Sequence, residues 1–445
     1  MKKKKSIWNL AGWIEGDKVV WIIVMMLILI SIVCIFSSTS RLLVGDQTRL
    51  DIVRRQLVIV ALGTAVIVIC YNIKNVNVFR RCSKWGFPAS FLMLLFLVAH
   101  GHIGPVKAVN INDSWRIIQF GSLQIHVFEI IKVLMVMYLA WAMDALKKGE
   151  LKGPQELIWK KVLYIYAPFL LIFVMCIPGS NTAALFIGGL MFITILLGGG
   201  NFKDMALLAI VGFLIVGSCY GIYNMTKDSA KPKMTRIGTA VSRIFDDTDY
   251  EAVYLDPSSS REVRQDAIDR LRQPYGAKIA VKEGGLIGKG PGQSTQRYMV
   301  PDMAEDYMYS FIIEEYGLVG GILVIFLYVS LLARSSIIAR NCGKNDLYAK
   351  LVVAGLSLLI TGQAFLHMFV NADIGPMTGQ TLPMISHGNS AFLCFSFAFG
   401  VLLSLSRIAA HNVELEERRA APLMDLDEDV KETLKDLDEF ESYDI

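Results

Sequence analysis

The feature of the sequence that most limits its possible folds is a series of apolar blocks, each about 20 residues long. A helix of that length spans the hydrocarbon core of a bilayer, and only helices or closed barrels satisfy every backbone hydrogen bond in lipid. The 445 residues are 54% apolar and only 19% charged. We therefore predict an all-α polytopic membrane protein with ten transmembrane helices, at 19–37, 56–73, 87–103, 126–143, 162–178, 181–198, 204–223, 306–333, 348–372 and 388–410.

The orientation of these spans is predicted from the loops between them. Lysine and arginine are concentrated in alternate loops, with the arginine-rich segment 38–55 as a local exception. Because positively charged short loops stay in the cytoplasm, we expect both termini there and the large loop 224–305, between helices 7 and 8, on the outer side. The basic segments are 1–5, 74–84, 144–161 and 334–350.

Three regions of the chain differ in composition. Residues 1–18 are a polar cytoplasmic N-terminus, and no A-x-A site marks the first span as a signal peptide. Residues 19–411 form one membrane domain. Residues 412–445 are an acidic cytoplasmic tail without a core-forming pattern, which we expect to be mobile, either as a docking segment or as a solvated extension.

Three smaller features of the sequence are a helix in the outer loop, the spacing of the cysteines and the net charge. Within the outer loop, "SSSREVRQDAIDRLRQP" predicts a short helix that Ser260 caps and Pro274 ends. The seven cysteines contain no C-x-x-C pair, which indicates small apolar residues rather than disulfides or metal ligands. The net charge of +4 gives no indication of nucleic-acid binding.

Three carboxylates stand where the eighth block begins, in "MVPDMAEDYMYSFIIEEYG". Asp302, Glu305 and Asp306 would share one face if the helix begins a turn before Asp306. Clustered like charges beside a region of low dielectric raise the pKa of at least one member, which can then accept a proton from a hydroxyl. The alternative is that Asp302 or Asp306 only caps the helix.

Two more acids, Glu314 and Glu315, lie deeper in the same block. Intramembrane acids face the bundle interior and mark a pathway or a polar contact. Gly317 and Gly321 follow as G-x-x-x-G, a pattern that lets a neighbouring helix approach closely. A polar contact between helices is therefore the favoured interpretation, with a catalytic role as the alternative.

A glycine-rich loop, "GGLIGKGPGQSTQR", runs from Gly284 to Arg297. Its backbone N–H groups and its cations, Lys289 and Arg297, suit a pyrophosphate. The spacing is not that of a P-loop, and a plain turn is the alternative. In the fourth block, Glu129 and Lys132 are three residues apart and are expected to pair on one helix face.

Two further external segments are polar. Trp115 and Arg116 lie in "NINDSWRIIQFG", and "NADIGPMTGQTLPMISHGNSAF" joins the last two spans. His387 in the latter is expected to form a hydrogen bond rather than bind a metal, since no second ligand stands at a usual spacing. We expect four polar segments to build one wet, charged cavity on the outer side: 110–132, 284–297, 301–315 and 371–390.

These motifs resemble those of the SEDS family (shape, elongation, division and sporulation), closest to its FtsW members and with RodA as a near relative. The resemblance covers residues from about 18 to 411, and its most specific parts are the glycine-rich loop, "VPDMAEDYMYSFIIEEYGLVGG" and "MTGQTLPMISHGNSA". It implies a bacterial cytoplasmic-membrane glycosyltransferase that polymerises lipid II into peptidoglycan strands, with inversion, during cell division. The chain departs from the family patterns at 112–118, 126–128 and 179–181.

The resemblance also implies roles for individual residues. Asp306 falls on the family's essential aspartate and would be the general base. The implied substrate-binding positions are Arg116, Glu129, Lys132, Lys289, Gln293, Ser294, Arg297, Asn371, Thr378, Ser386 and Ser390. The implied structural or pathway positions are Glu305, Glu314, Glu315, Gly317, Gly321 and Pro383.

The implied reaction joins two lipid-linked sugar units. Asp306 would take the proton of the acceptor's GlcNAc 4-hydroxyl, whose oxygen attacks the anomeric carbon of the donor's MurNAc. Cations, and a divalent metal such as Mg²⁺ or Mn²⁺ if one binds, would neutralise the departing pyrophosphate. The implied partners are lipid II, a class B penicillin-binding protein (a transpeptidase) and other membrane proteins of the division or elongation machinery. The alternatives are an elongation-type polymerase, a lipid II flippase and a non-catalytic division scaffold.

Overall fold

A computed structural model describes most of the chain. The described residues are 15–38, 49–111, 114–121, 123–226, 250–256, 258, 260–343, 346–375 and 378–441. The basic N-terminal segment and parts of the loops 38–55 and 224–305, on which some predictions above depend, therefore lie outside the described residues.

Each of the ten apolar blocks coincides with a helix or with consecutive helices. They are α1 (Lys18–Ser38), α2 (Arg49–Asn72), α4 (Gly86–Val98), α5 (Val127–Lys148), α6 (Leu157–Lys161) with the π-helical η3 (Val162–Tyr166) and α7 (Ala167–Cys176), α8 (Asn181–Leu197), α9 (Phe202–Thr226), α13 (Met308–Asn341), α14 (Leu347–Asn371) and α15 (Asn389–Glu441). Within the described residues, seven helical stretches are long and apolar enough to cross a membrane. The helices α4 and α8 are apolar but shorter, and α5 carries charges at both ends. The count of ten spans stays a prediction.

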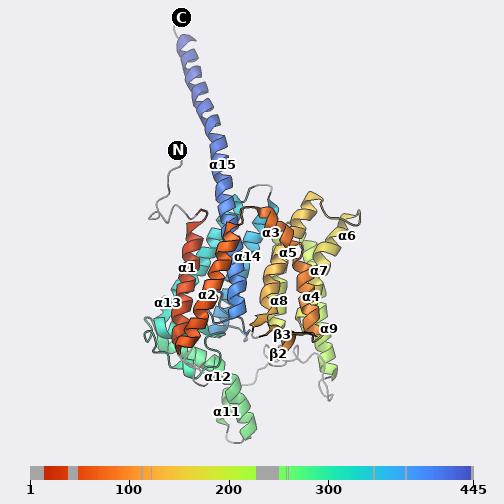
Figure 1. Cartoon of the computed structure of the whole chain (residues 1–445), viewed down its shortest axis with the longest axis vertical. Coiled ribbons are helices and arrows are strands. Elements are labelled where there is room, and N and C mark those ends of the chain that lie inside the picture. The colour runs from red at the N-terminus through yellow and green to blue at the C-terminus, as the bar shows by residue number, and fades with distance from the viewer. Residues whose placement is uncertain are drawn as a thin grey trace.

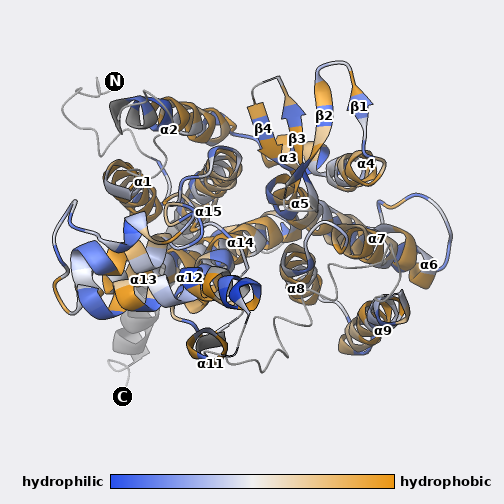
Figure 2. Ribbon diagram, turned by 90° about the horizontal axis from the view of Figure 1, so that it is seen from below, coloured by the Kyte–Doolittle hydropathy of each residue, from blue (hydrophilic) through white to orange (hydrophobic). Residues whose placement is uncertain are grey.

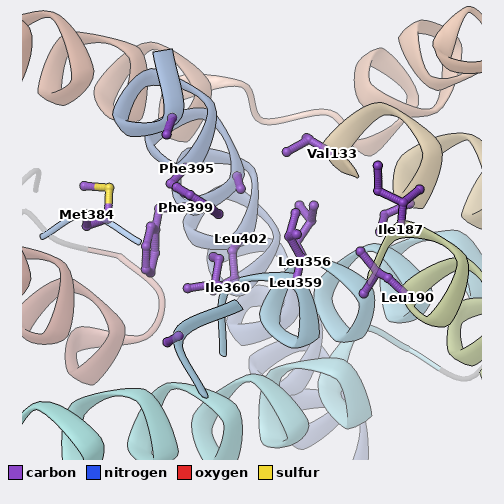
Figure 3. Packing of buried hydrophobic residues seen from close by; sticks show 14 of the residues in the cluster. Val133, Ile187, Leu190, Leu356, Leu359, Ile360, Met384, Phe395, Phe399 and Leu402 are labelled. Carbon is purple, nitrogen blue, oxygen red and sulfur yellow. The ribbon is translucent and has the colours of Figure 1, made fainter. Parts of the chain in front are cut away.

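The helices pack into one bundle with α14 and α15 near its centre. Their apolar windows are 72% and 78% buried, whereas that of α9 is only 18% buried. Figure 3 shows side chains from four helices meeting in the core, among them Val133 of α5, Ile187 of α8, Leu356 of α14 and Phe399 of α15. The outer helix α9 exposes 81% of Phe213, as a lipid-facing helix does.

The first and last spans meet at one end of the bundle. The Arg334 guanidinium at the end of α13 lies 2.6 Å from the Asp17 carboxylate just before α1, and the Asp17 N–H donates to Ser406 Oγ of α15 at 3.2 Å. Figure 1 shows the strands, α11 and α12 at the opposite end. The described ends of the chain, at residues 15 and 441, therefore adjoin the same end of the bundle, whereas the assignment of that end to the cytoplasm stays a prediction.

The expectation of an all-α chain is wrong in one region, because a small antiparallel sheet follows α4. Its strands, in spatial order, are β1 (His102–Ile103), β2 (Val106–Ile111), β3 (Ser114–Phe120) and β4 (Leu123–His126). Apolar and polar residues alternate from Val106 to Ala108, and the alternation shifts at Val109 and Asn110, where the strand has an irregular register. Gly104 and Gly121, both with positive φ, occupy the turns on either side of the β2–β3 pair. The sheet leads directly into α5.

The segment 224–305, which was predicted to lie on the outer side, contains α11 (Tyr250–Leu255) and α12 (Arg261–Gly284), and a short α3 (Val76–Ser83) follows α2. Ser260 caps α12 as predicted, and its hydroxyl accepts from the Val263 N–H at 3.3 Å. The prediction that Pro274 ends this helix is wrong, because α12 continues past it to Gly284. Ala277 and Ala280 in the second half are buried where α12 lies along α13 (Figure 2). This burial offsets the one backbone hydrogen bond that proline removes.

The acidic tail also differs from the expected mobile segment. The helix α15 continues without interruption to Glu441 and projects from the bundle (Figure 1). The tail is rich in glutamate and leucine, which favour helices even without a packed core. A docking role for this helix stays a prediction.

Candidate active site

The acidic turn 301–307 lies immediately before α13 rather than within its first turn. Tyr307 is the N-cap residue and makes no side-chain capping hydrogen bond, so the alternative in which Asp302 or Asp306 caps the helix is wrong. Asp302 has a left-handed backbone with φ of 54°. The Glu305 and Asp306 N–H groups both donate to the Asp302 carbonyl at 2.9 Å, which closes the turn and keeps the three acids together.

The Asp306 carboxylate is partly buried, and no donor from the described residues bonds to it. Burial, and then the negative charges of Glu305 and Asp302, raise the pKa of Asp306 to about 7, whereas Arg116 acts in the opposite direction. This agrees with the predicted effect of clustered acids. A carboxylate whose pKa lies near neutral and whose oxygens are not already engaged is suited to accept a proton.

Residues of the last external segment hold the backbone of the acidic turn. Ser386 Oγ donates to the Glu305 carbonyl at 2.7 Å. Asn371 Nδ2 donates to the Asp306 carbonyl at 3.0 Å, while its Oδ1 accepts from the Ser310 N–H at 2.9 Å. These two predicted substrate-binding residues therefore position the acid through its main chain.

The same external segment forms a wall beside the acids. The His387 N–H donates to the Ala304 carbonyl at 2.9 Å, and His387 Nδ1 lies 3.3 Å from Glu305 Oε1, so the predicted hydrogen bonding of this histidine is confirmed. A Cβ on Gly379 would stand 3.6 Å from Asp306 Oδ2, and Thr378 adjoins this glycine. The Pro383 carbonyl accepts from Tyr328 at 2.5 Å, which anchors the segment to α13.

The sheet brings Arg116 to the same place. Arg116 lies on β3, and its charge acts on the Asp306 carboxylate. Its Nε is buried without a hydrogen-bond partner among the described residues. At the end of β4 the His126 N–H donates to Ser390 Oγ at 3.2 Å, which joins the sheet to the start of α15. Arg116 is therefore a cation near the acid with donor capacity to spare.

Lys132 forms the predicted pair with Glu129, with Nζ 2.7 Å from Oε1. The same ammonium donates to the side-chain oxygens of Gln363 and Gln380, both at 2.7 Å, and Lys132 is 1% exposed. Its three donors are thus used inside the protein, where they join α5, α14 and the last external segment. Neither glutamine was predicted from the sequence. Gln363 and His367 lie four residues apart in an apolar block, and this spacing is a recognisable signal of an interior polar face.

Glu314 holds the glycine-rich loop. Its carboxylate accepts from Lys289 Nζ at 2.8 Å, from the Thr295 N–H at 2.8 Å and from the hydroxyl of Ser294. Glu315 accepts from Ser37 of α1 at 2.6 Å and from the N–H of Gly292 in the loop at 3.1 Å. The expected helix–helix contact is therefore mainly a contact between a helix and a loop.

Gly317 interrupts α13 and admits the same loop. Its φ of 70° and ψ of −175° are not helical. The carbonyls of Glu314 and Glu315 accept from the N–H groups of Lys289 and Gly290, both at 2.9 Å. A Cβ on Gly317 would stand 2.2 Å from the Leu286 carbonyl oxygen. The close approach at Gly317 is thus made by loop backbone and not by a neighbouring helix. The atoms nearest to a Cβ on Gly321 would be side-chain atoms of α13 itself.

The two cations of the loop are bound to protein groups. Lys289 contacts Glu283 and Thr295 besides Glu314. Arg297 is buried, and its Nη1 donates to the Ser37 carbonyl at 3.0 Å. Arg297 and the residues 300–305 line a cavity of about 220 Å³ beside the acidic turn. Gln293 is exposed at the edge of the loop.

The four predicted polar segments therefore meet at one end of the bundle, through hydrogen bonds and charge. The 220 Å³ cavity is lined by Ser38, Arg297 and residues 300–305, so it covers only part of the single cavity that was expected. Among the residues described, no group of three or more histidine, cysteine, aspartate or glutamate side chains is placed to hold a metal ion.

Comparison with known proteins identifies relatives over nearly the whole chain. A family model described as a cell cycle protein of the FtsW, RodA and SpoVE type matches residues 17–411. Stage V sporulation protein E of Bacillus subtilis (strain 168) is 26% identical over 406 residues, which cover 89% of this chain and 98% of that protein. The probable peptidoglycan glycosyltransferase FtsW of Coxiella burnetii is 24% identical over 418 residues, which cover 91% and 99%.

Solved structures share the fold. RodA of Thermus thermophilus superimposes with a TM-score of 0.56 at 19% identity, over 89% of this chain and 98% of that one. A chain of a peptidoglycan synthase complex, described by its coordination of polymerization and crosslinking, gives 0.61 at 19% identity over the same shares. This chain therefore belongs to the FtsW, RodA and SpoVE family of cell cycle proteins, which is the SEDS family that its motifs resemble.

Proposed function

We propose that this protein is a peptidoglycan glycosyltransferase that polymerises lipid II at the outer face of the cytoplasmic membrane, with Asp306 as its general base. The observation that carries the proposal is the state of one carboxylate. Asp306 has a pKa of about 7 and no donor among the described residues, and it lies at the entrance to α13. Relatives named as probable peptidoglycan glycosyltransferases support the choice of reaction.

In the proposed step, the acceptor's GlcNAc 4-hydroxyl gives its proton to Asp306 while its oxygen bonds to the anomeric carbon of the donor's MurNAc. The bond from that carbon to the pyrophosphate oxygen breaks, and the lipid pyrophosphate leaves with the electron pair, so the anomeric centre inverts. Because pyrophosphate is a stable anion, a second carboxylic acid is not needed. Asn371 and Ser386 keep the base in place through the backbone of the turn.

Of the four cations considered for the leaving group, Arg116 is the best placed. Lys132, Lys289 and Arg297 donate to protein oxygens at distances between 2.7 and 3.0 Å. Nε is buried without a partner among the described residues in both Arg116 and Arg297, but the two Nη atoms of Arg297 donate to Ser37 and Tyr298. Of the four cations, Arg116 is the one whose charge acts on Asp306. A guanidinium can engage two phosphate oxygens at once. We therefore assign charge neutralisation to Arg116 and structural roles to the other three.

We further propose that the polymerase acts in cell division together with a transpeptidase of the class B penicillin-binding type. The structural relative from a peptidoglycan synthase complex supports such a pairing. A fluorescent fusion of the full chain is expected at mid-cell. Labelling of the side wall would instead favour the elongation role.

The test of the activity is Asp306→Asn in the purified full-length protein, with labelled lipid II and the transpeptidase partner. Loss of the base is expected to lower the rate of strand formation by about 10²- to 10⁴-fold. Asp302→Asn is the matched control, because it removes the same charge from the same turn and should retain most of the rate. Polymerisation by Asp306→Asn near the wild-type rate would remove the assignment, and lipid II translocation into vesicles that survives this change would favour a flippase.

A further inference from the structure

A second cavity, of about 400 Å³, lies away from the acidic turn, at the end of the bundle that adjoins the termini. It is enclosed by the last turns of α5, by α6 and η3, and by the glycine turn that follows α8. Its wall is apolar on one side and cationic at the rim. Its apolar lining includes Met143, Leu146 and Ile195, and its polar lining includes Lys147, Lys161 and Tyr166.

The rim of this cavity has an excess of positive charge. No carboxylate of the described residues forms an ion pair with Lys147, which stands in the last turn of α5. The Lys161 ammonium lies 3.6 Å from the Asp204 carboxylate, and Tyr166 donates to that same carboxylate at 2.7 Å. The Asp204 carboxylate is thus shared between Lys161 and a tyrosine hydroxyl, and the described residues provide no ion pair for Lys147.

The cavity adjoins a surface that faces lipid. Leu157, which lines it, is 58% exposed, and Ile158, Trp159 and Leu163 on the same helical stretch are between 53% and 63% exposed. Exposed apolar side chains with a tryptophan, beside lysines at the ends of helices, are typical of the membrane interface. A ligand that enters from the bilayer would therefore place a chain on the apolar wall and a head group at the lysines.

We propose that this cavity binds an anionic phospholipid from the leaflet at that end of the bundle. The phosphate lies between Lys147 and Lys161, and the first part of an acyl chain runs along Met143, Leu146 and Ile195. A zwitterionic head group brings its own cation, which the two lysines repel, so a lipid with net negative charge is preferred. Basic pockets between membrane helices recognise lipid head groups in this way. The site is separate from the proposed reaction, and neither depends on the other.

The test uses the purified full-length protein and counts retained lipids by native mass spectrometry, in mixtures of phosphatidylglycerol and phosphatidylcholine. Wild type is expected to retain phosphatidylglycerol selectively. Lys147→Gln/Lys161→Gln should weaken its binding about tenfold. The control Lys152→Gln/Lys160→Gln removes the same charge from the same loop outside the cavity and should leave binding unchanged.

Three results would overturn the proposal. The first is equal retention of the two lipids by wild type, and the second is an equal loss of phosphatidylglycerol binding in the two double variants. The third is protection from thermal unfolding by inorganic phosphate alone that matches the protection by phosphatidylglycerol. The last would mean a free-anion site. If the lysine variant does not fold, the preference of wild type still decides, together with Ile195→Trp, which fills the apolar wall and should lower lipid retention while both lysines stay.

Discussion

Two acidic groups eight residues apart, Asp306 and Glu314, occupy opposite environments. The Glu314 side chain is fully buried and accepts from an ammonium, from hydroxyls and from backbone N–H groups of the glycine-rich loop. Asp306 is closer to solvent, yet its nearest charged neighbours are other carboxylates, and the described residues give it no donor. The chemical state of a carboxylate in this protein therefore depends on the donors and charges around it as well as on burial, which is the first cause of the raised pKa of Asp306.

The largest stability effect is expected at Glu314. Glu314→Ala leaves Lys289, Ser294 and the Thr295 N–H without their acceptor and should lower the free energy of unfolding by about 3 kcal/mol. Thermal unfolding of the purified protein measures this loss. Glu283→Ala is the control, because it removes the other, half-exposed carboxylate that contacts Lys289 and should cost less than about 1 kcal/mol. Equal effects of the two changes would mean that the buried carboxylate contributes no more to stability than the half-exposed one.

The break in α13 gives the next effect. Gly317→Ala places a Cβ into the Leu286 carbonyl and strains a left-handed backbone, so a loss of about 2 kcal/mol or more is expected. Gly189→Ala in α8 is the matched control, since nothing lies within 4 Å of a Cβ added at that position. This change should be neutral or slightly stabilising. If Gly317→Ala unfolds at the wild-type temperature, the loop does not depend on this approach.

The dependence on pH sharpens the comparison at Asp306. Its pKa is raised from the ordinary 3.8 to about 7, so folding favours the protonated acid. Its contribution to stability is complete below pH 3.8 and is lost as the pH rises through about 7. The polymerisation rate should rise over the upper part of that range, because the base must be ionised.

Rate measurements between pH 5.5 and 8.5 test this, together with unfolding of wild type and Asp306→Asn. The difference in unfolding temperature should favour the variant more at pH 8 than at pH 5. Asp302→Asn removes a charge that raises the pKa and should move the midpoint of the rate profile to lower pH. An unmoved midpoint would mean that Asp302 does not act on the base.

The smallest effect is expected at the surface. Lys278 of α12 lies 2.6 Å from Asp373 of the last external segment, but both side chains are about half exposed. Such a pair contributes about 1 kcal/mol or less. Lys278→Ala should therefore change the unfolding temperature only slightly, and a loss as large as that of Glu314→Ala would show that α12 is held mainly by this contact.

Much of the fold could be read from the sequence, since each apolar block became a helix and the Ser260 cap and the Glu129–Lys132 pair were predicted correctly. The sheet was missed because its strands are short and lie between two long apolar blocks. Pro274 was misread because the burial that carries α12 past it comes from α13. The end of α15 was misread because a mobile tail was expected from its acidic charge and its lack of a core-forming pattern, and neither property prevents its glutamates and leucines from favouring a helix.

The sequence by itself determined that this protein lies in a membrane, the order of its helices and the position of its acids along the chain. The reason is that apolar length and charge spacing are local properties. Only the tertiary structure decided which acid is engaged. The partners of Glu315 and Lys132 include Ser37 and Gln380, which lie 278 and 248 positions away along the chain. Hydrogen bonds of that separation exist only once the bundle has formed, and none of them from the described residues reaches the Asp306 carboxylate.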